Sequence, residues 1–381
     1  MRDFASTNTF TGPFERAVQF LSDAAQDGGI YGLVASAPDL LTAAAVRRGA
    51  RTIVQVLPDG DAAASCASDV RFYLGATGPA DRVLEEEVLL YPSSDILPYS
   101  SEVPDTEVSL ARSAVLYRLA DASSPRVVMS GLDALLRKVT PRREFGQSCF
   151  SLRVGEELDR ESFLARLVGA GYRRSPLVEE PGDFSVRGFI IDLYSPLYSF
   201  PVRVEQMGDV VESLRFFDPT NQRSREDVPS VRISPLHMLI PDPDALERGL
   251  IRLHLVCEDR GVEKRVRQRL IDDFKHGVRF PGAESYLPYF FPELETLLDY
   301  LPSDATLVLP DEDTLLRAFE DAEEEIFRGW EAAAGDGQPV PSPESLFLSR
   351  EEFFQRIALF RRVTVSSLEI EERGADRKSV V

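Results

Sequence analysis

Three short β-favouring runs decide the fold of the middle of this chain: GDFSVRG at 182–188, PVRVE at 201–205 and ESLRFFD at 212–218. In the second run, Val202 and Val204 alternate with Arg203 and Glu205. A period of two places successive side chains on opposite faces of a strand. The runs therefore predict a small antiparallel sheet that buries the valines and turns Arg203 and Glu205 outward.

Apolar residues of the neighbouring runs complete this predicted sheet. They are Val186, Phe189, Ile191 and Leu193, and Arg187 ends its strand at the sheet edge. Two interpretations of the outward face stay open. In the first, the face is solvated, and its charged side chains pair only with neighbours in the sheet. In the second, it is a polar docking surface, because the arginine fork suits carboxylate-rich partners.

The charge of the chain argues against tight binding to nucleic acid. Its 381 residues carry a formal net charge of −20, and such a surface repels a phosphate backbone. We therefore expect no strong autonomous DNA binding. The cysteines Cys66, Cys149 and Cys257 are isolated, and no apolar run reaches the roughly 18 residues of a membrane span. These features predict a cytoplasmic protein without disulfides, a metal site or a membrane partner.

Lysine usage bears on nucleotide chemistry. The chain has only four lysines, Lys138, Lys264, Lys275 and Lys378, and none of them follows a glycine. A P-loop needs Gly-Lys-Ser/Thr, because the loop amides cradle the phosphates and the lysine neutralises them. The sequence therefore contains no P-loop, and we expect no ATP hydrolysis by this chain.

On both sides of the middle stretch, strand-like runs alternate with helical ones. The predicted strands are residues 30–35, 52–57, 88–91, 126–130 and 306–309. This alternation predicts a parallel sheet with helices on its faces. A single long helix is expected over 245–275. Asp311 and the acids after it are interpreted as a polar helix start, since acids are favoured in a first helical turn.

The middle stretch resembles a known domain. The run GDFSVRGFIIDLY (182–194), with the VRVE and ESLRFFD runs that follow, is similar to the UvrA-binding domain shared by UvrB and the transcription-repair coupling factors. The resemblance covers roughly residues 15–365. Only about a dozen residues separate Pro98 from Arg112, too few for the long β-hairpin with which UvrB engages damaged DNA. This difference favours the N-terminal UvrB-homology module of a transcription-repair coupling factor.

The resemblance implies a two-part α/β fold. Its larger part is a degenerate RecA-like (P-loop NTPase-type) parallel-sheet domain in two segments, and its smaller part is an inserted α/β UvrA-binding domain. The implied boundaries are 1–153 (domain 1a), 154–240 (domain 2), 241–367 (domain 1b) and 368–381 (a polar tail). Ser36-Ala-Pro-Asp39 stands where active motors of this type carry Gly-Lys-Thr, and Pro310 replaces the metal-binding Asp at the strand end.

The resemblance also implies a function: recruitment of UvrA to lesion-stalled RNA polymerase in transcription-coupled nucleotide excision repair. The positions that match the family's UvrA-binding residues are Arg174, Arg187, Arg203, Glu205 and Met207. Gln206-Met207 replaces an aromatic pair, and Met207 can supply an apolar contact. No catalytic residue, cofactor or metal is implied for this chain. In the family, ATP and Mg²⁺ serve a C-terminal motor, and RNA polymerase and duplex DNA bind elsewhere. The alternative hypothesis is a nucleotide-dependent DNA helicase or translocase domain.

Overall fold

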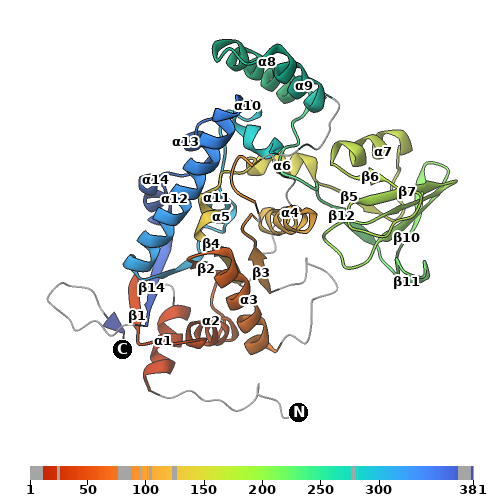
Figure 1. Ribbon diagram of the computed structural model, residues 1–381. Coiled ribbons are helices and arrows are strands. Elements are labelled where there is room, and N and C mark those ends of the chain that lie inside the picture. Colours follow the sequence, from red (N-terminus) through yellow and green to blue (C-terminus); the bar gives the residue numbers. More distant parts are fainter. Residues whose placement is uncertain are drawn as a thin grey trace.

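The computed structural model describes residues 12–23, 26–75, 87–94, 96–100, 102, 105–121, 127–275, 280, 282–367 and 379–380. The protein is a mixed α/β structure with one large parallel sheet, a six-stranded sheet beside it, and a two-stranded sheet (Figure 1). Among the described residues, no helix combines the length and the apolar character needed to cross a membrane.

The large sheet has the strand order β15-β1-β14-β13-β2-β4-β3, and all its neighbouring strands pair in parallel. Its strands are β1 (Gly28–Tyr31), β2 (Ile53–Leu57), β3 (Val88–Tyr91), β4 (Val127–Gly131), β13 (Thr306–Pro310), β14 (Arg361–Ser366) and β15 (Ser379–Val380). The predicted parallel α/β arrangement is therefore confirmed. The first strand ends earlier than predicted, because Gly32 turns the chain with a φ of 78°.

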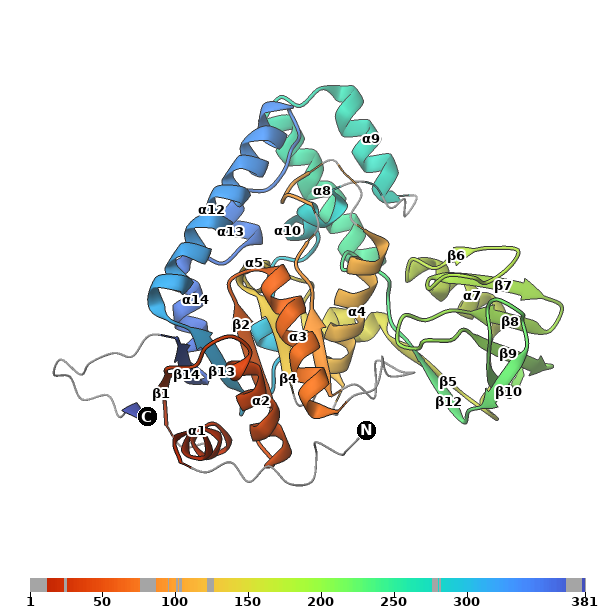
Figure 2. The ribbon, with the colours of Figure 1, turned by 60° about the horizontal axis from the view of Figure 1, so that its bottom comes forward.

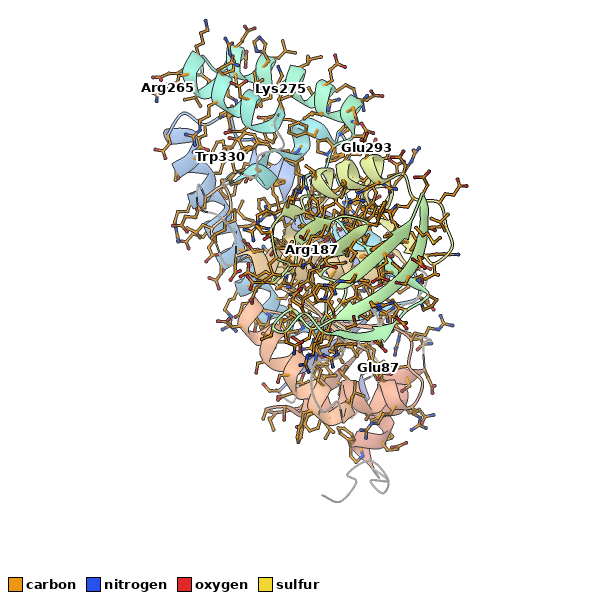
Figure 3. All side chains as sticks on the ribbon, turned by 90° about the vertical axis from the view of Figure 1, so that its right-hand side faces the viewer. Glu87, Arg187, Arg265, Lys275, Glu293 and Trp330 are labelled. Atoms are coloured by element: carbon orange, nitrogen blue, oxygen red, sulfur yellow. The ribbon has the colours of Figure 1, made fainter. Side chains whose placement is uncertain are left out.

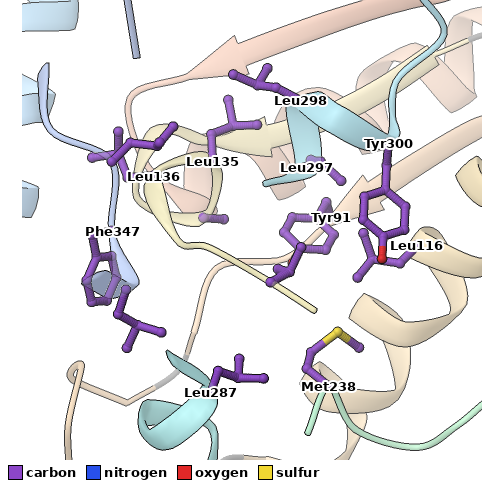
Figure 4. Packing of buried hydrophobic residues seen from close by; sticks show 14 of the residues in the cluster. Tyr91, Leu116, Leu135, Leu136, Met238, Leu287, Leu297, Leu298, Tyr300 and Phe347 are labelled. Carbon is purple, nitrogen blue, oxygen red and sulfur yellow. The ribbon is translucent and has the colours of Figure 1, made fainter. Parts of the chain in front are cut away.

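Helices cover both faces of this sheet, as its continuous apolar strands require. On one face, Ile53 and Val308 pack with α1 (Pro13–Ser22), α2 (Ala37–Arg47) and α3 (Gly60–Leu74). On the other face, Val54 and Leu307 join the largest core (Figure 4). The helices of that side are α4 (Thr106–Ala120), α5 (Leu132–Leu136), α11 (Leu297–Tyr300), α12 (Glu312–Gly335), α13 (Pro343–Leu346) and α14 (Arg350–Ile357).

The six-stranded sheet has the order β11-β10-β9-β8-β7-β6 and is antiparallel except between β6 and β7. Its strands are β6 (Arg173–Arg174), β7 (Asp183–Arg187), β8 (Ile190–Leu193), β9 (Val202–Met207), β10 (Val210–Phe217) and β11 (Ser224–Asp227). The helix α7 (Arg160–Gly169) and the pair β5 (Phe150–Arg153) and β12 (Ser230–Ile233) contribute to the same core. The antiparallel sheet predicted for 182–218 is confirmed. In chain order, the whole unit lies between β4 and β13 of the large sheet.

The predicted helix over 245–275 is wrong in one respect: it is two helices. They are α8 (Pro243–Asp259) and α9 (Lys264–Lys275), which lie at one end of the molecule (Figure 2). Gly261 ends α8 with a φ of 63°, and the Val262 N–H donates to the Cys257 carbonyl at 2.8 Å. A left-handed glycine of this kind commonly ends a helix, because residues with a Cβ rarely adopt that backbone conformation. Two short helices, η2 (Ala283–Tyr286) and α10 (Leu287–Phe290), and α6 (Arg142–Ser148) complete the described elements.

The structure confirms that the acids from Asp311 onward begin a helix. Asp311 is the N-cap of α12, and its carboxylate accepts hydrogen bonds from the Thr314 N–H at 3.0 Å and the Thr314 hydroxyl at 3.1 Å. Pro310 is the last residue of β13. The acid at this strand end thus satisfies a free backbone donor of the helix.

Candidate protein-binding interface

One face of the six-stranded sheet gathers most of the predicted site residues. In β9, Val202, Val204 and Gln206 are buried, so Arg203, Glu205 and Met207 share the opposite, outward face. Register extends this face to the next strands, because Asp192 lies opposite Arg203 and Arg187 lies opposite Ile190. Figure 3 views the molecule from the side of this sheet and labels Arg187. Below, the outward face means this side of β7 to β10.

On the outward face, the Asp192 carboxylate contacts both Arg203 and Arg187. The Arg203 guanidinium donates two hydrogen bonds to it, Nε to Oδ1 at 2.7 Å and Nη2 to Oδ2 at 2.9 Å. Arg187 Nη2 donates to the same Oδ2 at 2.5 Å. The Asp192 side chain is 2% exposed, Arg203 15% and Arg187 50%. The pair of arginines on one carboxylate leaves a net positive charge, and Arg187 is the member that a partner can reach.

Arg203 is held tightly in this network. Its guanidinium lies 4.6 Å from the centroid of the Phe217 ring, and the hydrogen bonds to Asp192 raise the pKa of Arg203. Glu205 contacts a different neighbour: it accepts from the Ser213 hydroxyl at 2.8 Å and pairs with Arg215 at 3.4 Å. Both residues therefore have partners inside the sheet, as the first interpretation of the face expects.

Exposed apolar residues lie beside the charges. Met207 is 71% exposed, Phe189 67% and Val210 39%. They lie at the ends of two hairpins whose turns are Gly188-Phe189 and Gly208-Asp209, and Met207 and Val210 face each other across the second turn. The Gln206 N–H donates to the Phe189 carbonyl at 2.9 Å, which brings the two turns together. The result is an apolar tip next to Arg187.

Phe189, expected among the apolar strand residues of the sheet, lies instead in a turn. Gly188 has a φ of 57°, and Phe189 does not have a positive φ. This pattern is typical of a two-residue hairpin turn with glycine first, so Phe189 is a turn residue. Gln206 follows the period of two in β9 and points inward. It is buried, and its side-chain amide donates to the Leu158 carbonyl at 3.1 Å, so only Met207 of that pair is presented to solvent.

Arg174 lies apart from the other predicted residues. In the parallel pairing of β6 with β7, it is opposite Phe184, whose side chain is in the core. Arg174 therefore lies on the face away from Arg187. Its neighbour Arg173 lies on the outward face, where Nε and Nη2 donate to Asp183 Oδ1 at 3.1 and 2.8 Å. This contact raises the pKa of Arg173, by the hydrogen bonds first and the charge of Asp183 second.

The segment from Ser36 to Asp39, which the resemblance leads us to expect in place of a P-loop, forms hydrogen bonds within the fold. Ser36 is the N-cap residue of α2, and its hydroxyl lies 2.7 Å from the Tyr73 hydroxyl. Asp39 is buried in the first turns of α2 and accepts from Gln55 Nε2 at 3.0 Å. Burial raises the pKa of Asp39. Among the described residues, no three His, Cys, Asp or Glu side chains are grouped as a metal site would require.

Comparison with known proteins identifies relatives of this chain. The sequence model of the UvrB interaction domain matches residues 150–238, a range that contains β5, α7, the six-stranded sheet and β12. The transcription-repair-coupling factor of Myxococcus xanthus is 33% identical over 314 residues, 81% of this chain and 26% of that protein. Its counterpart in Bacillus subtilis is 30% identical over 240 residues, 59% of this chain and 20% of that protein.

The same-named protein of Escherichia coli K12 is 25% identical over 346 residues, 90% of this chain and 29% of that protein. The chain thus spans about a quarter of the length of the curated relatives it matches. Residues 150–238 belong to the UvrB interaction domain family, and the chain is related to the N-terminal region of transcription-repair coupling factors.

Proposed function

We propose that this chain recruits UvrA to lesion-stalled RNA polymerase in transcription-coupled repair, and that the outward face of the six-stranded sheet is its docking surface. The observation that carries the proposal is the match of residues 150–238 to the UvrB interaction domain. The exposed composition of the face supports it. An apolar tip of Phe189 and Met207 beside the reachable Arg187 fits an interface with an aromatic anchor and charged neighbours.

The exposure of the arginines supports different roles for them in this proposal. Arg187 is half exposed and contacts the partner, whereas Arg203 is mostly buried and positions Asp192 and Arg187. Glu205 holds Arg215 on the same face. Arg174, on the opposite face, contributes little. We further propose domain 2 as an independent unit that begins near residue 150 rather than 154, since β5 pairs with β12 and Leu152 lies in the second core.

Calorimetric titration with the cognate UvrA tests this proposal. Arg187→Ala and Phe189→Ala are each expected to weaken binding by about 2 kcal/mol, or roughly thirtyfold, as central interface residues do. Arg174→Ala is the matched control: it removes an exposed arginine of the same domain from the other face. Equal losses for Arg174→Ala and Arg187→Ala would reject the outward face, and no binding by the unaltered chain would reject the function.

We also propose that this chain hydrolyses no ATP and binds DNA weakly, and that contacts with RNA polymerase and duplex DNA are made by other regions of the longer relatives. Support comes from the residues at the nucleotide position. Ser36 and Asp39 form hydrogen bonds within the fold, and Asp311 caps α12. Phosphate release should equal the blank with and without DNA. Turnover that Asp311→Ala abolishes would instead support a helicase or translocase domain.

A further inference from the structure

The outward face carries a further arginine, Arg215 of β10, which the sequence comparison with the family does not single out. Arg215 alternates with the buried Leu214 and Phe216, so its side chain points away from the core. The register places it directly opposite Arg203 of β9. Like charges on opposite residues of neighbouring strands destabilise a sheet. The pair is therefore unfavourable unless each arginine has an anionic partner.

Arg203 has such a partner within the protein. Its two hydrogen bonds to Asp192, at 2.7 and 2.9 Å, have the length of charge-assisted bonds, about 2.7–2.9 Å. The buried Phe217 ring lies against the same guanidinium. Because its nitrogens are engaged and its side chain is mostly covered, Arg203 offers little surface to a partner protein.

Arg215 is held more loosely. Its Nη2 lies 3.4 Å from Glu205 Oε2, and its Nε lies 3.4 Å from Asp227 Oδ1. The Asp227 side chain is 82% exposed, so water screens its charge and the pair contributes little. The Arg215 side chain is 33% exposed, against 15% for Arg203. Arg215 is therefore a reachable cation that can gain a stronger contact from a partner than those it makes in the sheet.

Glu205 and Ser213 orient this cation. The Ser213 hydroxyl donates to Glu205 Oε2 at 2.8 Å and accepts from Arg215 Nη2 at 3.3 Å. Ser213 lies opposite Glu205 in the pairing of β10 with β9, so the register of the two strands fixes this contact. The contacts from Glu205 through Ser213 keep the guanidinium of Arg215 close to the sheet and limit its conformational freedom.

We propose that Arg215 is a second partner-contacting cation of the outward face, that it binds a carboxylate of UvrA, and that Glu205 acts through it as a positioning residue. This inference rests on the proposed function. Arg187 acts from β7 and Arg215 from β10, three strand spacings or about 14 Å apart. The face therefore fits a partner surface with two separate carboxylates, each of which a guanidinium can bind with two parallel hydrogen bonds.

Calorimetric titration of Arg215→Gln with the cognate UvrA tests the contact. Affinity should fall at least about tenfold, because a charge-assisted hydrogen bond to the partner is lost. The affinity that remains should depend less steeply on salt than that of the unaltered chain, which a merely structural role would not predict. Thermal stability should not fall, because the contacts of Arg215 in the sheet are weak. Arg174→Gln, on the opposite face, is the matched control and should keep both the affinity and its salt dependence.

A double-mutant cycle tests the role of Glu205. Glu205→Gln should weaken UvrA binding in the unaltered chain and change it little in the Arg215→Gln background, because its effect passes through Arg215. Equal losses in both backgrounds would mean that Glu205 contacts UvrA itself, and would overturn its positioning role.

The outcomes separate this inference from the proposed function. Unchanged affinity in Arg215→Gln, together with a loss in Arg187→Ala, would overturn the second contact and leave the docking surface in place. Absence of binding by the unaltered chain would instead reject the proposed function and, with it, this inference.

Discussion

Removal of the Asp192 carboxylate should open the six-stranded sheet. In Asp192→Ala, the 15%-exposed Arg203 loses both of its charge-assisted hydrogen bonds, and the half-exposed Arg187 loses one. Loss of one partner from a buried ion pair costs about 3–5 kcal/mol, whereas an exposed pair contributes about 0–1 kcal/mol. We therefore expect a loss near 3–5 kcal/mol, set by Arg203 rather than by Arg187.

Hydrogen exchange of peptides from β8 and β9 measures this loss locally. The only tryptophan, Trp330, lies in α12, so its fluorescence does not report on this sheet. Exchange through opening of the sheet should accelerate by roughly two to almost four orders of magnitude. Asp227→Ala is the matched control, because Asp227 also pairs with an arginine but is 82% exposed. Unchanged exchange in Asp192→Ala would show that the hydrogen bonds between Arg203 and Asp192 do not stabilise the sheet.

Three further changes test the larger part of the fold by thermal unfolding. Burial raises the pKa of Asp39, so the folded state holds that proton more tightly and stability falls as pH rises above the ordinary aspartate value. Asp39→Asn, which keeps an acceptor for Gln55, should raise the unfolding temperature at pH 7 and not near pH 3; the opposite pattern would contradict the raised pKa. Asp311→Ala should cost about 1 kcal/mol through the lost helix cap, and an unchanged midpoint would argue against the cap. Gly329→Ala should cost about 1–3 kcal/mol, because the new Cβ would lie 2.0 Å from the Pro98 carbonyl oxygen; a neutral result would mean that α12 stands farther from residue 98.

The local patterns of the sequence predicted much of the fold. The alternation of Val202 and Val204 with Arg203 and Glu205 gave the correct faces of β9, because side-chain direction in a strand depends only on local geometry. The acids after Pro310 likewise indicated a helix start. Asp192 as the partner of Arg203 could not be derived in this way. That contact depends on the register between β8 and β9, which turn length and the packing of both strands determine.

Two signals in the sequence could have predicted the hairpin turns and the break between α8 and α9. Gly188-Phe189 and Gly208-Asp209 are both glycine-first pairs between strand-like runs, which is typical of two-residue hairpins. They would have placed Phe189 at an exposed turn. Gly261 inside the predicted long helix was a second such signal. The buried ion pair of Arg137 and Glu284 has no comparable signal, because the two residues are 147 positions apart and only tertiary packing brings them within 3.3 Å.

Docking of UvrA on the outward face is tested most directly by hydrogen exchange of this chain with and without saturating UvrA, because the measurement maps the interface without altering a residue. We expect protection of peptides that cover 187–190 and 203–210, with little change in α7 and around Arg174. Protection of α7 and β6, with unchanged exchange at the two hairpins, would contradict it.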